Sequence, residues 1–193
     1  MRWSVYLAML LVAAAIDASF GSVLAIGDLR GHLVPSVVVF ALLSAPKRIG
    51  VRVAMAAGLV VDLLTPIVLS TQETLVVPGP RVLGFALGAL AVVQLRGLLH
   101  RQNPLAGAVA TAVFSLLAAV VFVFLFSIRS LVLDGGAPWW PGSGAAEVWR
   151  RLLEAAGDAV IAVPALWILG KTRPLWAFTT ATRVAPGLAR QGG

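Results

Sequence analysis

The chain alternates between long apolar segments and short polar or basic ones. The apolar segments cover residues 3–26, 33–45, 49–69, 82–99, 104–128 and 152–170. Most of them approach the roughly 20 residues that a helix needs to cross about 30 Å of hydrocarbon. The pattern predicts an all-α, polytopic membrane helix bundle with six transmembrane helices. The number falls to five if the short segment 33–45 does not cross the bilayer completely.

Composition supports this prediction. Of the 193 residues, 60% are hydrophobic and 12% are charged, whereas soluble domains are about 45–50% apolar and about 25% charged. We expect one transmembrane domain over residues 1–170, followed by a basic cytoplasmic tail over residues 171–193. A cleavable signal peptide ending near residues 18–22 is an alternative for the first segment, although its apolar run exceeds the usual length of about 7–15 residues.

The basic residues predict the orientation in the membrane. With a cytoplasmic N-terminus and six spans, the cytoplasmic side receives Arg2, Lys47, Arg48, Arg52, Arg96, Arg101, Lys171, Arg173, Arg183 and Arg190. The outer side receives only Arg30, Arg81, Arg129, Arg150 and Arg151. Because Lys and Arg collect in cytoplasmic loops, both termini are expected to be cytoplasmic. This topology accounts for most of the net charge of +7, so nucleic acid is not an expected partner.

The third apolar segment contains an acid, in the sequence Gly58-Leu59-Val60-Val61-Asp62-Leu63-Leu64-Thr65-Pro66. An aspartate near the bilayer centre costs about 2.5–3.5 kcal/mol on insertion scales, so Asp62 is a candidate functional residue. Its alternative role is that of a hydrogen-bonded acid inside the bundle. Pro66 lacks a backbone N–H, so the helix should kink or end there. Asp17, in the first segment, poses the same question.

No Lys or Arg is expected at the depth of Asp17 or Asp62. Each carboxyl group must therefore be neutralised, accept hydrogen bonds or face water. Thr65 lies one turn after Asp62, and Thr111 and Ser115 form a polar stripe on one face of the fifth helix. These three hydroxyl groups are the candidate partners for an intramembrane acid.

Two further spacings concern helix contacts. Gly84 and Gly88 form a GxxxG pattern, which allows two helix backbones to approach closely, and a homodimer through these glycines is one such arrangement. Glu154 and Asp158 lie one helical turn apart close to Arg150 and Arg151. We expect these four side chains to form a solvated ion-pair cluster near the outer surface.

Catalytic chemistry is not expected. The chain has no cysteine and only two histidines, His32 and His100, in loops predicted to lie on opposite sides of the membrane. Neither a metal cluster nor a histidine-based triad is readily assembled from them. No Walker A or GxGxxG phosphate-binding sequence is present either. The sequence therefore predicts no catalytic, cofactor-binding or metal-binding residues.

The segment Ala57-Gly58-Leu59-Val60-Val61-Asp62-Leu63-Leu64 is similar to the Gly-Leu-x-x-Asp signature of MreD, the bacterial rod-shape-determining membrane protein family. The surroundings agree in layout over about residues 1–170. Pro35 precedes an apolar run, Pro46-Lys47-Arg48 forms a basic loop, and Leu83-Gly84 opens a helix that ends at Arg96.

The resemblance implies a six-helix, multi-pass subunit of the elongasome in the bacterial cytoplasmic (inner) membrane. Such a subunit has no chemistry of its own. It binds MreC, and through it MreB filaments, RodA and a class B penicillin-binding protein, and it helps position lateral-wall peptidoglycan synthesis to maintain cell shape.

Two alternatives stay open. MreD is similar in fold to the substrate-binding subunits of energy-coupling-factor vitamin transporters, so the chain could instead enclose a small ligand. Independently of any resemblance, Asp17 and Asp62 could serve a proton-coupled carrier of small solutes.

Overall fold

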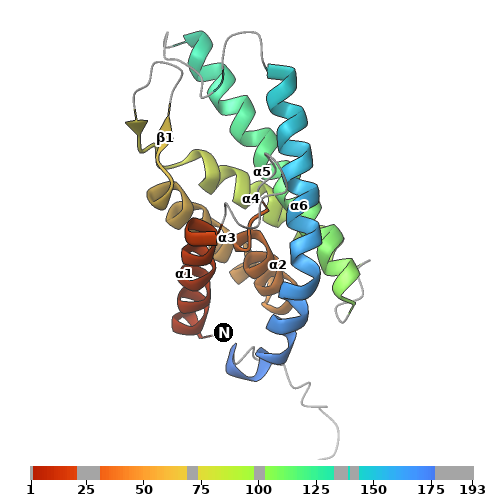
Figure 1. The fold of residues 1–193 in the computed structure, drawn as a ribbon. Helices are drawn as coiled ribbons and strands as arrows, with labels where there is room; N and C mark the ends of the chain where they lie inside the picture. Colours follow the sequence, from red (N-terminus) through yellow and green to blue (C-terminus); the bar gives the residue numbers. More distant parts are fainter. Residues whose placement is uncertain are drawn as a thin grey trace, which may run out of the picture.

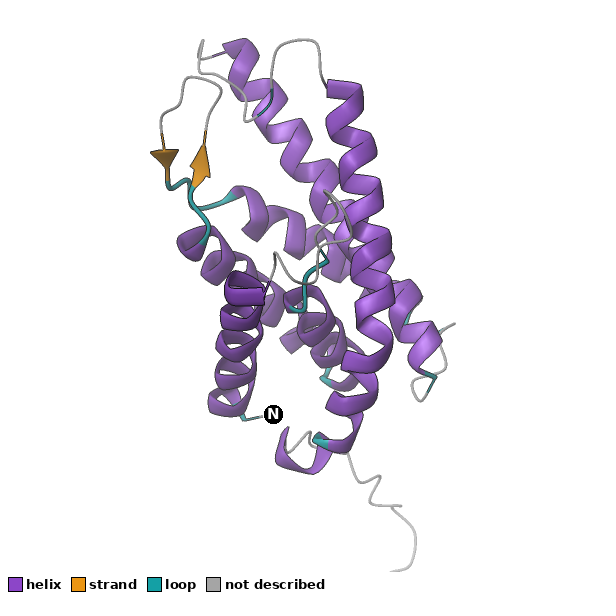
Figure 2. Ribbon diagram, viewed as in Figure 1, coloured by secondary structure: helices purple, strands orange, loops and turns teal. Residues whose placement is uncertain are grey.

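The fold of the chain was obtained as a computed structural model, which describes residues 2–20, 31–68, 74–97, 103–132, 139 and 144–176. Its helices are α1 (Trp3–Phe20), α2 (Val34–Ser44), α3 (Lys47–Leu64), α4 (Pro80–Leu95), α5 (Pro104–Val132), α6 (Gly144–Lys171) and the 3₁₀ helix η1 (Arg173–Trp176) (Figure 1). The predicted helical fold is confirmed. One addition is a short antiparallel hairpin of β1 (Ile67–Val68) and β2 (Thr74–Leu75) (Figure 2).

Helix α2 is the centre of the bundle. It contacts α1, α3, α4, α5 and α6, and every residue of α2 except Ser44 is buried. A helix that is apolar on all sides is stable only when other elements surround it. At 1.5 Å per residue its 11 residues extend about 16 Å, roughly half of the hydrocarbon thickness. The short segment 33–45 is therefore a core helix that does not reach across a bilayer by itself.

The helix ends test the predicted boundaries. Helix α3 ends at Leu64, two residues before Pro66, as the proline predicts. The start of α6 was predicted wrongly. It begins at Gly144, eight residues before the predicted start at Leu152. The added turns are stabilised by Glu147, which pairs with Arg150 three residues later and with Arg151 four residues later on the same helix face.

The predicted boundary of the basic tail also needs correction. Trp176, in η1, has no exposed surface and packs against the rings of Tyr6 and Phe40. Its carbonyl accepts a hydrogen bond from the backbone N–H of Arg2 at 3.0 Å. The ordered bundle therefore continues to Trp176, and residues 177–193 lie outside the described residues.

Charge is segregated between the two ends of the bundle. At one end α1 starts beside η1, and the Arg96 guanidinium at the end of α4 donates to the carbonyls of Leu42 and Ala45 at the end of α2. Within the described ranges, the charged residues at this end are all basic: Arg2, Lys47, Arg48, Arg52, Arg96, Lys171 and Arg173. The described acids, Asp17, Asp62, Glu147, Glu154 and Asp158, lie near the C-terminal ends of α1 and α3 or between the start and the middle of α6, together with Arg81, Arg129, Arg150 and Arg151.

Two of the described helices are long and apolar enough to cross a membrane. They cover Leu105–Ser130 in α5 and Ala145–Lys171 in α6. The apolar parts of α1, α2 and α4 are shorter, and α3 is interrupted by the charges of Lys47, Arg48, Arg52 and Asp62.

Candidate functional site

Asp62 caps the helix that follows it. Its side chain is buried, and Oδ2 accepts a hydrogen bond from the backbone N–H of Gly79 at 2.8 Å, while Oδ1 accepts one from Arg81 at 3.4 Å. These donors lie at the start of α4, where backbone N–H groups lack partners within the helix. A carboxylate there satisfies the donors and interacts favourably with the helix dipole. The geometry corresponds to the hydrogen-bonded alternative for Asp62.

Arg81 in turn caps the end of α3, and we call the contact between the end of α3 and the start of α4 the α3–α4 junction. Its guanidinium Nη1 donates to the Val61 carbonyl at 3.4 Å and to the hydroxyl of Thr65, at the C-terminal end of α3. Two expectations are thereby corrected. A cation does lie beside Asp62, because α4 begins before the predicted start at residue 82. The Thr65 hydroxyl bonds to Val61 and Arg81, and within the described part of the chain it makes no hydrogen bond with Asp62.

Gly58 explains the spacing of the Gly-Leu-x-x-Asp sequence. A Cβ atom at Gly58 would lie 2.7 Å from the Arg81 carbonyl oxygen and 2.7 Å from the Val82 Cα atom. Since backbone atoms cannot easily move away, only glycine fits here. Gly58 and Asp62 are one turn apart, so they share the face of α3 that meets α4. Gly58 permits the close approach of the two helices, and Asp62 caps the start of α4.

Asp17 and Asp158 hold the start of α2 in the same manner. Asp17 accepts hydrogen bonds from the backbone N–H groups of Leu33 at 2.7 Å and Val34 at 3.1 Å. Asp158 Oδ1 accepts one from the backbone of His32 at 2.7 Å and lies 3.4 Å from His32 Nδ1. The contact between the His32 imidazole and the Asp158 carboxylate raises the pKa of His32 above its usual value, outweighing the opposing effect of burial. Sequence analysis gave His32 no such role, because its partner is 126 residues away.

The expected solvated cluster is instead largely buried. Glu154 and Asp158 are only 9% and 4% exposed, because they lie within α6, which packs against α2 and α5. Arg150 and Arg151 both pair with Glu147 and Glu154, as their spacing indicates. Asp158 pairs with His32 rather than with an arginine.

The glycines of α4 face another helix of the same chain. A Cβ atom would lie 2.9 Å from the Ala118 carbonyl oxygen at Gly84 and 3.0 Å from the Phe114 carbonyl oxygen at Gly88. The GxxxG face is thus occupied by α5, which rules out a homodimer through these glycines in this fold. Thr111 is also removed as a partner for an acid, since its hydroxyl donates to the Gly107 carbonyl at 2.9 Å.

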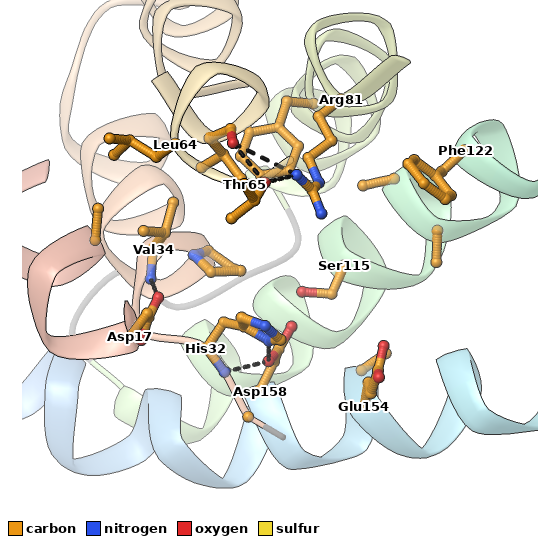
Figure 3. Close-up of a pocket in the computed structure, with 18 of the residues that line it drawn as sticks. Asp17, His32, Val34, Leu64, Thr65, Arg81, Ser115, Phe122, Glu154 and Asp158 are labelled. Carbon is orange, nitrogen blue, oxygen red and sulfur yellow. Dashed lines mark hydrogen bonds and ion pairs between the residues drawn. The ribbon is translucent and has the colours of Figure 1, made fainter. Parts of the chain in front are cut away.

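A cavity of about 650 Å³ lies between the helices, a size typical of small-molecule sites. Asp17, His32, Thr65, Arg81, Ser115, Arg151, Glu154 and Asp158 provide its polar lining (Figure 3). Most of the remaining lining is apolar and comes from α1, α2, α3, α4, α5 and α6. The cavity therefore combines guanidinium and hydroxyl donors with carboxylate acceptors around an apolar space. The described residues contain no group of three or more His, Asp or Glu that could hold a metal ion.

The sequence singles out several of the lining residues: Asp17, Thr65, Ser115, Arg151, Glu154 and Asp158. It predicts contacts among some of them, but not the cavity that all of them line. Asp62 and Gly58 lie at the adjoining α3–α4 junction.

The chain matches no protein-family model. Comparisons with curated proteins and with solved structures find no significant match.

Proposed function

We propose that this chain is an MreD-like, non-enzymatic membrane subunit of the bacterial elongasome. It is a six-helix protein of the cytoplasmic membrane with both termini in the cytoplasm. It binds an MreC-like protein and, through it, helps position MreB, RodA and a class B penicillin-binding protein for lateral-wall synthesis.

The observation that carries this proposal is the joint action of Gly58 and Asp62. These residues carry the resemblance to MreD, and they form one junction, in which Gly58 admits the α4 backbone and Asp62 caps it. The Gly and Asp positions of the Gly-Leu-x-x-Asp signature thus acquire a physical reason. The junction fixes the angle between α3 and α4. A subunit that presents a defined surface to a partner requires such a fixed angle.

Membrane embedding is supported by the outer surface of the bundle. Large apolar side chains are exposed on several helices: Leu7, Leu11 and Val12 on α1, Leu83, Leu87 and Leu90 on α4, Val120 and Phe124 on α5, and Val160, Trp167 and Ile168 on α6. Extensive apolar surface is unfavourable in water and marks a membrane or protein contact. The basic end, which carries no described acid, agrees with a cytoplasmic location.

Gene neighbourhood provides a first test. The proposal expects a gene for an MreC-like protein beside the gene for this chain. A neighbourhood of vitamin-uptake genes would contradict it and favour the second candidate below. The biochemical test is affinity capture of the partner from membranes.

A second candidate is a substrate-binding subunit of an energy-coupling-factor type transporter, and the cavity of about 650 Å³ favours it. This candidate predicts that a vitamin remains bound after purification. No observation favours the proton-coupled carrier, because both of its proposed acids, Asp17 and Asp62, accept backbone hydrogen bonds that define helix starts. We do not pursue it.

A further inference from the structure

Two guanidinium groups approach the same aromatic ring in the cavity wall. The Cζ atom of Arg81, from α4, lies 5.7 Å from the centroid of the Phe122 ring, and that of Arg151, from α6, lies 4.8 Å from it. The ring belongs to α5, so three helices contribute to this cluster. Two like charges that approach one ring repel each other unless negative charge is also present.

The two arginines differ in their compensation. Arg151 donates from Nε to Glu147 at 2.8 Å and lies 3.6 Å from Glu154. Arg81 bonds to two neutral oxygens, the Val61 carbonyl and the Thr65 hydroxyl. Among the described residues, Arg81 forms no ion pair with a carboxylate. Asp62 and Glu154 lie near enough to offset part of its charge. Because a guanidinium has five N–H donors and these two bonds use only Nη1, Arg81 keeps donors for a ligand in the cavity.

Ser115 supplies a hydroxyl donor that has no partner among the described residues. Its Oγ atom is buried and forms no hydrogen bond with any described residue. The side chain faces the cavity and points toward the space between Arg81 and Asp158 (Figure 3). A buried polar atom that is left without a hydrogen bond destabilises the fold. An acceptor on a bound molecule would relieve this cost.

The acids on the opposite side of the cavity already have partners. Asp17 and Asp158 accept backbone hydrogen bonds at the start of α2, and Glu154 pairs with Arg150 and Arg151. The oxygens of these acids therefore already have donors, although Glu154 still acts on the charge of Arg81. A bound anion at Arg81 and Ser115 would not have to displace them.

The rest of the cavity wall is apolar and continues to the surface. Leu11 of α1 and Leu64 of α3 both line the cavity, yet their side chains are 53% and 56% exposed. Ala14, Ala15 and Ala18 form the adjacent wall. An apolar rim of this kind admits an apolar body and gives no hydrogen bonds to a small hydrated ion.

From these contacts we propose that the cavity binds an amphiphilic anion, that is, a phosphate or carboxylate group carried on an apolar body. The anionic group contacts the guanidinium of Arg81 and the hydroxyl of Ser115, with Arg151 on the other side of Phe122. The apolar body lies along Leu11 and Leu64. This inference does not rest on the proposed partner, because ligand binding is measured on the purified chain alone.

The test uses the purified full chain in a neutral detergent, titrated with dodecyl phosphate and, separately, with inorganic phosphate. Wild type should bind dodecyl phosphate saturably, as measured by calorimetry, and bind inorganic phosphate at least about tenfold more weakly. Arg81→Gln should weaken dodecyl phosphate binding by about tenfold or more, because charge-assisted hydrogen bonds are lost. Arg52→Gln, which removes an exposed arginine outside the cavity lining, is the matched control and should bind as wild type does.

Ser115→Leu is a second variant that fills the cavity without touching the α3–α4 junction, in case Arg81→Gln does not fold. Loss of binding by folded Ser115→Leu supports the site. Unchanged binding by either folded variant overturns it. The proposal is also overturned if wild type does not bind dodecyl phosphate, or if it binds inorganic phosphate equally well.

Discussion

Asp62 and Arg81 cap each other's helices. The Asp62 carboxylate accepts the backbone N–H of Arg81 at 3.4 Å, while the Arg81 guanidinium donates to the Val61 carbonyl at 3.4 Å. The anion therefore lies at the positive N-terminus of α4, and the cation lies at the negative C-terminus of α3, so both dipoles are favourably matched. This pair makes the end of one helix and the start of the next a single unit.

Replacing Asp62 should loosen this unit. Asp62→Leu removes both hydrogen bonds and leaves buried N–H groups without an acceptor, so the free energy of unfolding should fall by about 2–3 kcal/mol. Asp62→Asn keeps one acceptor oxygen and should cost about 1 kcal/mol. Denaturant unfolding in detergent, followed by circular dichroism, measures both values. Equal stability of Asp62→Leu and wild type would show that the cap is not needed.

Glycine substitutions should have opposite effects at two helical positions. Gly58→Ala places a Cβ atom against the α4 backbone at 2.7 Å and should destabilise the protein by about 1–3 kcal/mol through overpacking. At Gly170, in α6, a Cβ atom would meet nothing within 4 Å, so Gly170→Ala should stabilise by about 0.5–1 kcal/mol through helix propensity. The same unfolding measurement compares them. Equal and small effects would contradict the close approach at Gly58.

His32 should make stability dependent on pH. The Asp158 hydrogen bond raises the pKa of His32 in the folded state, so its contribution is complete below the unfolded value of about 6.5 and is lost as the pH rises through the folded pKa. Wild type should therefore lose more thermal stability than His32→Gln between about pH 5.5 and pH 8.5. If thermal stability changes equally with pH in the two proteins, His32 does not cause the pH dependence.

The lack of cysteine makes membrane topology directly measurable. Arg48→Cys lies at the basic end, and Ala145→Cys lies in the first turn of α6, both at exposed positions. In intact cells a membrane-impermeant maleimide should label Ala145→Cys and should label Arg48→Cys only after the membrane is opened. Labelling of both cysteines from the same side would contradict the proposed orientation.

Local pattern predicted the helices well, because apolar runs and Pro66 act within a few residues of where they occur. The helix caps could not be predicted, since Asp62, Asp17 and Asp158 bond to backbone groups 16 to 126 residues away. Arg81 was misplaced for a related reason. Its position depends on where α4 begins, and Asp62 stabilises that start together with the local signals of Gly79 and Pro80. Trp176 was assigned to the tail because only tertiary contacts with Tyr6 and Phe40 bury it.

Capture from native membranes tests the central proposal most directly. The tagged full chain, extracted in mild detergent, should recover an MreC-like protein in near-stoichiometric amount, and Asp62→Leu should recover much less than wild type because its partner surface is no longer fixed. Arg52→Gln should recover the wild-type amount. Normal recovery with Asp62→Leu would contradict the role of the α3–α4 junction. Recovery of no such protein with wild type, together with a bound vitamin, would contradict the proposed function itself.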